Sequence, residues 1–157
     1  MITDEASAPT PQIPHGLYLS FDYGERYIGV ASGHSQTGTA SPAGVINNDS
    51  GSVDWAALDK IFQQWQPVGL VVGIPLHMDG SEQALGQHVR GFIKRLAKRY
   101  TLPVYPSDER LTTREASSII RENRRRGKRR KTSKADLDSI AAALILEKWF
   151  GTHHEFN

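Results

Sequence analysis

Short apolar runs of strand length fill the first part of the chain. Three of them span residues 17–22, 27–32 and 38–48, and glycine-containing connections separate them. Pro42 interrupts the third run, which is typical of an edge strand or a bulge. The pattern predicts an antiparallel meander of three strands.

Helical periodicity dominates the rest of the chain. Apolar residues three and four positions apart predict helices over residues 52–66 and 81–100. Capping-type residues at Thr112 and Ser133 predict two further helices. Asp136, near the start of the last helix, is expected to act as a cap.

Two more strands lie between these helices. Residues 69–75, GLVVGIP, have the continuous apolar pattern of a strand covered on both faces, and residues 102–106 form a shorter run. Three strands followed by alternating helices and strands predict an α/β fold, with a mixed five-stranded sheet and helices on both faces. Such sheets place their sites at the carboxyl ends of strands.

Length and composition favour one domain in a reducing compartment. A chain of 157 residues suits a single domain. We expect a flexible leader over residues 1–16, a domain over 17–150 and a tail over 151–157. The chain has no cysteine, which excludes a disulfide framework, a zinc knuckle and a thiol nucleophile. The leader lacks the basic and apolar regions of a secretory signal, so a cytoplasmic protein is expected.

The charge is distributed unevenly. Residues 121–134 contain nine cations and one acidic residue, a net charge of +8, so the remaining chain carries −6 of the total +2. A basic segment beside an acidic body suggests a polyanionic partner, although a solvated loop without a ligand would have the same composition.

Three carboxylates occupy positions that can converge. Asp22 ends the first strand, Glu109 follows the strand that ends near Pro106, and Asp138 lies in the first turns of the last helix. Each has a simpler explanation: a turn residue, an ion pair with Arg110, or an interaction with the helix N-terminus.

Together the three carboxylates indicate metal chemistry. Converging carboxylates repel one another unless a cation joins them, and hard oxygen ligands favour Mg²⁺ or Mn²⁺ over zinc. Two such ions could activate water for phosphodiester hydrolysis.

Four motifs then resemble a known family. They are FDYGERYIGVA, VVGIPLHMDGSE, DERLTTREA and DSIAAALILEKWF, which start at Phe21, Val71, Asp108 and Asp138. From Leu17 to Phe150 the chain resembles the bacterial RuvC-like family described as Holliday-junction resolvases or as nucleases for the 5′ end of pre-16S ribosomal RNA. An Asp-x-Gly motif also opens actin-like sugar kinases, but those need a second domain of comparable size.

The resemblance implies a ribonuclease H-like fold and a site in which Asp22, Glu109 and Asp138 bind Mg²⁺ or Mn²⁺ and act as the catalytic residues. The candidate substrate-binding residues are Arg26, His77, Arg110, Arg124, Arg125, Arg129 and Arg130. The family usually has asparagine at the position of His77, where a neutral change on an exposed loop is favoured over a phosphate contact. Trp55, Trp65 and Trp149 fit helical stripes and are expected mainly in the core.

The favoured function is a metal-dependent nuclease that processes the 5′ end of pre-16S ribosomal RNA. The alternatives are a Holliday-junction DNA resolvase with the same site and a non-catalytic nucleic-acid-binding regulator. Nucleic acid is the expected partner, no membrane is expected, and the chain is expected as a monomer or a homodimer.

Overall fold

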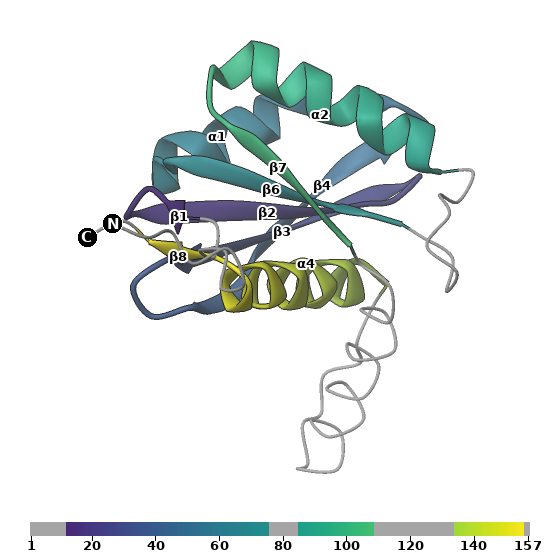
Figure 1. Cartoon of the computed structure of the whole chain (residues 1–157). Coiled ribbons are helices and arrows are strands. Elements are labelled where there is room, and N and C mark those ends of the chain that lie inside the picture. The colour runs from purple at the N-terminus through teal and green to yellow at the C-terminus, as the bar shows by residue number, and fades with distance from the viewer. Residues whose placement is uncertain (1–11, 76–84, 109–133, 156–157) are drawn as a thin grey trace, which may run out of the picture.

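Strand β2 (Leu17–Tyr23) is the strand at which two kinds of pairing meet (Figure 1). It pairs antiparallel with β3 (Tyr27–His34) on one side and parallel with β6 (Gly69–Ile74) on the other. The strand order of the sheet is β5-β4-β3-β2-β6-β7. The computed structural model describes residues 12–75, 85–108 and 134–155.

The remaining elements are β1 (Gln12–Ile13), β4 (Thr39–Asp49), β5 (Ser52–Val53), α1 (Trp55–Trp65), α2 (Gly86–Tyr100), β7 (Val104–Asp108), α4 (Lys134–Gly151) and β8 (His154–Glu155). The predicted elements that the structure describes occur in the predicted order, and three two-residue strands, β1, β5 and β8, are added to them. The antiparallel meander, the α/β class and the mixed sheet are confirmed. The helix predicted from Thr112 lies outside the described residues.

The sheet has six strands where the sequence predicts five. The additional strand is β5, two residues long, and the pattern assigns those residues to the start of a helix. Helix α1 begins after Asp54, whose Oδ1 accepts the Ala57 N–H at 3.1 Å. A two-residue strand is too short for a periodicity signal, so only the pairing with β4 reveals it.

Strand β4 contains the irregularity that Pro42 predicts. Val30 pairs with Gly44 whereas Ala31 pairs with Pro42, so Ala43 is an extra residue in β4. Proline has no N–H to donate to a ladder, and a bulge accommodates it.

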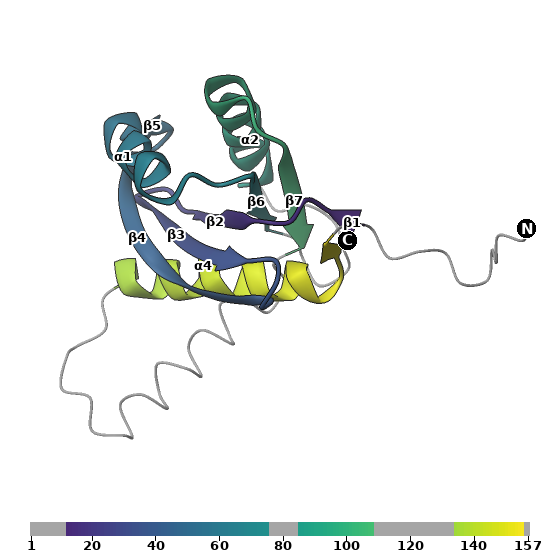
Figure 2. The same ribbon diagram turned by 90° about the vertical axis from the view of Figure 1, so that its left-hand side faces the viewer.

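Helices cover both faces of the sheet, as predicted. Helices α1 and α2 lie on one face and α4 lies on the other (Figures 1 and 2). Alternate residues of β2 serve the two faces: Leu19, Phe21 and Tyr23 belong to the core under α1 and α2, and Tyr18 belongs to the core under α4. Because β2 contributes to both cores, it is buried along nearly its whole length.

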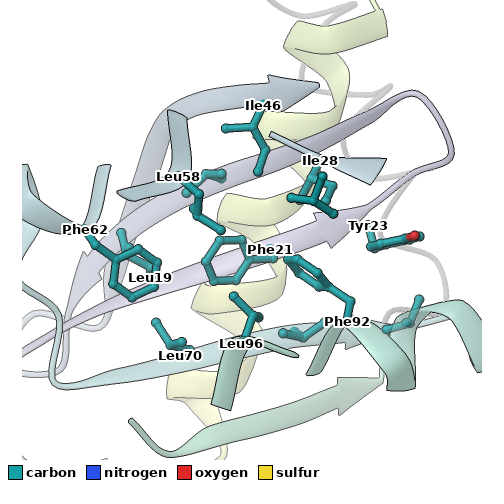
Figure 3. Packing of buried hydrophobic residues seen from close by; sticks show 14 of the residues in the cluster. Leu19, Phe21, Tyr23, Ile28, Ile46, Leu58, Phe62, Leu70, Phe92 and Leu96 are labelled. Atoms are coloured by element: carbon teal, nitrogen blue, oxygen red, sulfur yellow. The ribbon is translucent and has the colours of Figure 1, made fainter. Parts of the chain in front are cut away.

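Aromatic side chains fill the core beneath α1 and α2. Phe21 lies at the centre of this cluster, with Leu58 and Phe62 from α1 and Phe92 and Leu96 from α2 around it (Figure 3). The Phe21 ring is 5.7 Å from that of Phe92 and 6.5 Å from that of Phe62. This core fixes both helices to the face of the sheet opposite α4.

A two-stranded parallel sheet joins the ends of the described chain. Gln12 pairs with His154 and Ile13 with Glu155, and Ile13 is buried against the aromatic residues of α4. These paired strands lie within the segments expected as leader and tail. A strand of two residues is too short to show an alternating pattern in the sequence. Within the described residues, no helix combines the length and the apolar character needed to span a membrane.

A polar cluster links α1 to α2 at the surface. Asp59 accepts hydrogen bonds from Nε and Nη2 of Arg99, at 3.0 and 2.6 Å, and from the Tyr100 hydroxyl at 2.6 Å. These bonds lower the pKa of the Asp59 carboxyl to about 2. Burial and the Asp59 carboxylate raise the pKa of Tyr100 above its ordinary value.

The Asp59 cluster predicts a pH dependence of stability. Because the folded-state pKa of Asp59 lies below its unfolded value, the unfolded chain binds more protons in acid, and the stability from this group is lost as the pH falls from roughly 4 to 2. The Asp59→Asn variant should therefore lose less stability than the wild type between about pH 5 and pH 3. Urea unfolding at both pH values measures the difference, and identical losses would contradict it.

Candidate active site

Strands β2, β6 and β7 end at one edge of the sheet. Phe21 pairs with Val72, which pairs with Pro106, and Ile74 pairs with Asp108, the last residue of β7. Carboxyl ends of parallel strands form a common edge where sites are usually built. Asp22 lies at this edge, and Glu109 directly follows Asp108 in the chain but lies outside the described residues.

The Asp22 side chain faces α4. The ring of Tyr18 is 5.3 Å from that of Trp149, and two residues further along β2 the Ser20 hydroxyl donates to the Ala142 carbonyl at 2.7 Å. Side chains two apart on a strand share a face, so Asp22 is next in this row. Residues closer to the carboxyl end of β2 contact residues closer to the start of α4: Tyr18 contacts Trp149, and Ser20 contacts Ala142. This trend places Asp22 beside the first turns of α4.

Gly29 shows how close α4 comes to Asp22. Gly29 is the direct cross-strand partner of Asp22, so positions 22 and 29 share a face with Cβ positions roughly 5 Å apart. A Cβ at Gly29 would lie 2.1 Å from the carbonyl oxygen of Asp138. The helix backbone at Asp138 therefore occupies the space beside Asp22, and only glycine leaves room for it.

The Asp138 carboxylate lies toward the turn that follows β2. Its Oδ2 is 4.0 Å from where a Cβ at Gly24 would stand. Position 24 continues the row of Ser20 and Asp22, and both carboxylates are half-buried. The structure thus brings together the two predicted carboxylates that it describes.

Small residues along β3 make this approach possible. Gly29, Ala31 and Gly33 are two residues apart and line the face under α4, where Ala31 packs against Ala142 and Ala143. A Cβ at Gly33 would be 3.0 Å from Leu146 Cδ2. Because no large side chain separates the sheet from the helix, α4 packs directly on the backbone of β3.

Asn48 holds the turn after β2. Its side chain is buried, its Nδ2 donates to the Gly24 carbonyl at 2.7 Å and its Oδ1 accepts the Gly51 N–H at 3.0 Å. Its backbone N–H donates to the Arg26 carbonyl at 2.8 Å. Asn48 therefore connects the turn of residues 24–27 to the turn of residues 48–51. The turn composition of NNDSG is the sequence signal for this role, which was not among the predictions above.

Of the predicted substrate-binding residues, Arg26 is the one that lies within the described part of the chain. Arg26 lies in the turn after β2 with an exposed side chain. The others lie outside the described residues: His77, Arg110, Arg124, Arg125, Arg129 and Arg130. Asp136 lies in the first turn of α4, which begins at Lys134, where a carboxylate favours the helix N-terminus.

The donor atoms at this edge suit a hard divalent cation. Asp22 and Asp138 present carboxylate oxygens from two rigid elements, β2 and α4, and such oxygens are preferred ligands of Mg²⁺ and Mn²⁺. Among the described residues, no cluster of three or more acidic or histidine side chains could hold a metal. The third predicted ligand, Glu109, is outside that part of the chain.

Substitution of Gly29 tests the close approach of α4. Gly29→Ala should destabilise the fold by about 1–3 kcal/mol, because the new Cβ overlaps the helix backbone at Asp138. Gly91→Ala is the matched control, since a Cβ there on α2 meets no atom within 4 Å. Alanine at that helix position should stabilise by roughly 0.5–1 kcal/mol. Urea unfolding measures both, and equal effects would refute the packing argument.

Substitution of Asn48 tests the turn. Asn48→Ala removes two side-chain hydrogen bonds and leaves the Gly24 carbonyl and the Gly51 N–H without those partners, at a cost of about 1–3 kcal/mol. The neighbouring Asn47 is exposed, so Asn47→Ala should change stability by less than about 0.5 kcal/mol. Thermal unfolding of the two variants distinguishes them; a similar melting temperature would argue against a positioning role for Asn48.

Comparison with known proteins identifies similar chains. Residues 16–152 match a family model described as RuvX, Holliday junction resolvase. A relative from Legionella pneumophila (strain Paris), named as a candidate pre-16S rRNA nuclease, is 44% identical over 137 residues, 87% of this chain and 96% of the relative. One of the same name from Haemophilus ducreyi is 48% identical over 132 residues, 84% of this chain and 94% of the relative.

Solved structures show the same fold. Thermus thermophilus RuvC in complex with a Holliday junction substrate superposes with a TM-score of 0.52 at 14% identity, covering 87% of this chain and 94% of that one. These matches confirm the resemblance that the four motifs indicate, the ribonuclease H-like fold class and the enzyme class, a hydrolase of nucleic-acid ester bonds.

Proposed function

The chain belongs to the RuvX family, and on this basis we propose that it is a metal-dependent nuclease that processes the 5′ end of pre-16S ribosomal RNA in the cytoplasm. The observation that carries the proposal is the juxtaposition of Asp22 and Asp138, which Gly29 permits. The names of the relatives support the substrate.

Asp22, Asp138 and Glu109 would hold Mg²⁺ or Mn²⁺ at the carboxyl edge of the sheet. A bound divalent cation would supply Lewis-acid activation of water and of the scissile phosphate. Asp22 on a central strand and Asp138 on α4 keep their relative positions because the Ser20–Ala142 hydrogen bond and the Gly29 contact lock the helix on the sheet. This rigidity would keep the two carboxylates in fixed relative positions when substrate binds.

Cations near this edge would hold the phosphate backbone. Arg26 lies in the turn after β2, within the same motif as Asp22. The other candidates lie outside the described residues: Arg110 directly follows Glu109 in the chain, and Arg124, Arg125, Arg129 and Arg130 belong to the dense run of positive charge in the sequence. Contacts of this kind position nucleic acid without reading its sequence.

A Holliday-junction resolvase is the second candidate. The description of the family model and the fold shared with RuvC both favour it. Cutting two strands in symmetric positions normally requires a two-fold dimer. Sizing in solution, together with cleavage of precursor RNA against four-way DNA junctions, separates the two functions: a monomer that cuts only the RNA excludes the resolvase.

Substitution of the carboxylates tests the catalytic assignment. Asp22→Asn and Asp138→Asn should each reduce cleavage at least about 100-fold, because a neutral amide is a poor ligand for a hard cation. Nucleic-acid binding should be retained or tightened, since repulsion of phosphate falls. Asp136→Asn, two residues before Asp138, is the matched control and should remain active. Unchanged turnover in Asp22→Asn would show that Asp22 is not a catalytic residue.

A further inference from the structure

Helix α2 has an unusual charge. Its fifteen residues, 86–100, contain five cations and no acidic residue. Lys94 and Lys98 are four residues apart, as are Arg95 and Arg99, so they form two adjacent rows on the helix surface, and all four are exposed. The second row borders the start of α1.

A shallow groove lies between α2 and the start of α1. Its volume is about 390 Å³, and Trp55, Arg95, Lys98 and Arg99 line it. One neighbour of Trp55 is Phe92, stacked at 6.0 Å, which ties the indole to the core. Trp55 was expected mainly in the core, but it is only half-buried. Part of its ring packs against Phe92, and another part lines the groove.

The two arginines of the groove are held in place. Arg95 Nη1 donates to the Gly51 carbonyl at 2.9 Å, and Arg99 binds Asp59. Both guanidinium carbons lie over the Trp55 ring, at 5.8 and 5.2 Å. Asp59 offsets the charge of Arg99, but the partner of Arg95 is a neutral carbonyl. Since no ion pair in the described chain involves Arg95 or Lys98, the groove keeps a positive charge.

Backbone contacts connect the groove to the turn that follows β2. Ser50, next to the Gly51 that Arg95 contacts, donates its N–H to the Glu25 carbonyl at 3.1 Å, in the turn after β2. A separate, smaller pocket of about 220 Å³ borders this turn. It is lined by Tyr23, Glu25, Ser50, Leu85 and His88. The turn of residues 48–51 thus contacts both the turn that follows β2 and the groove.

From these observations we infer that the groove binds a single-stranded segment of the polynucleotide substrate, an inference that rests on the proposed nuclease function. Arg95 and Lys98 bind phosphates while a base packs on the exposed part of Trp55, the combination that single-strand sites use. The groove is the size of a small-ligand pocket, so it takes a nucleotide unit of one strand rather than a duplex.

A solvated basic helix face is the simpler alternative. It accounts for the exposed lysines, but not for an aromatic side chain beside two positioned guanidiniums in one hollow. The two explanations differ in a measurable way, because only a binding groove changes the salt dependence of nucleic-acid affinity when its cations are removed.

The experiment measures binding of a labelled uridine RNA of about 12 nucleotides by fluorescence anisotropy, between about 50 and 200 mM salt. Arg95→Gln combined with Lys98→Gln should flatten the slope of log K against log salt by about 1.4, since each contact to a single strand contributes about 0.7. Affinity at about 0.1 M salt should fall roughly 20-fold. Lys148→Gln, an exposed lysine on α4, is the matched control and should bind as the wild type does.

Trp55 provides a second readout. RNA should quench tryptophan fluorescence in the wild type and in Trp65→Phe, and the quenching should be lost in Trp55→Phe. A deoxythymidine strand of the same length, tested in parallel, shows whether the groove distinguishes RNA from DNA. Both readouts use the full chain with calcium in place of magnesium.

The outcomes separate this inference from the proposed function. If the wild type cleaves precursor RNA while the double variant keeps the wild-type slope and affinity, the groove inference is overturned and the nuclease stands. If the variant loses affinity but the wild type cleaves nothing, the groove is supported and the nuclease fails. Quenching that persists in Trp55→Phe would also overturn the role of the groove.

Discussion

The contact between the backbone of α4 and Gly29 of β3 is the constraint on which the candidate site depends. A helix normally lies on a sheet with side chains between them, but here a Cβ on β3 would fall within 2.1 Å of the Asp138 carbonyl oxygen. The stripe of Gly29, Ala31 and Gly33 brings α4 to the sheet backbone, and the partner strand β2 carries Asp22 at the same level. Two carboxylates more than a hundred residues apart in the chain thereby become neighbours.

Strand β2 divides the protein into two faces with different tasks. Its odd-numbered residues, such as Phe21, anchor α1 and α2, and its even-numbered residues meet α4, through Ser20 and Ala142 among others. Because a strand alternates sides, one seven-residue segment both stabilises the core and aims an aspartate at the edge. Burial on both faces leaves β2 little freedom, which suits a residue expected to hold a metal ion.

Asn48 connects the edge with Asp22 to the face with the basic groove. It binds the turn after β2 through Gly24 and the turn before β5 through Gly51, whose carbonyl in turn accepts Arg95. Because both polar atoms of this buried amide are hydrogen-bonded, it holds the two turns together with little desolvation penalty. Loss of the side chain would leave one backbone group in each turn without this partner. The turn that Arg95 contacts is therefore tied to the turn that follows β2.

Much of this protein could be read from its amino-acid sequence. Periodicity predicts the meander, the covered strand β6, the helices and the α/β class, because burial imposes repeats of two and 3.6 residues that are local in the chain. The four motifs point to the family and to Asp22, Glu109 and Asp138. The two-residue strands β1, β5 and β8 and the contacts of Trp55 were beyond prediction, because they arise from pairing between distant segments. The composition around Asn48 indicates a turn, but not which second turn Asn48 binds. Only the tertiary structure could bring Asp138 beside Asp22, since that proximity requires α4 to pack on glycines of another strand, a contact without any local signal.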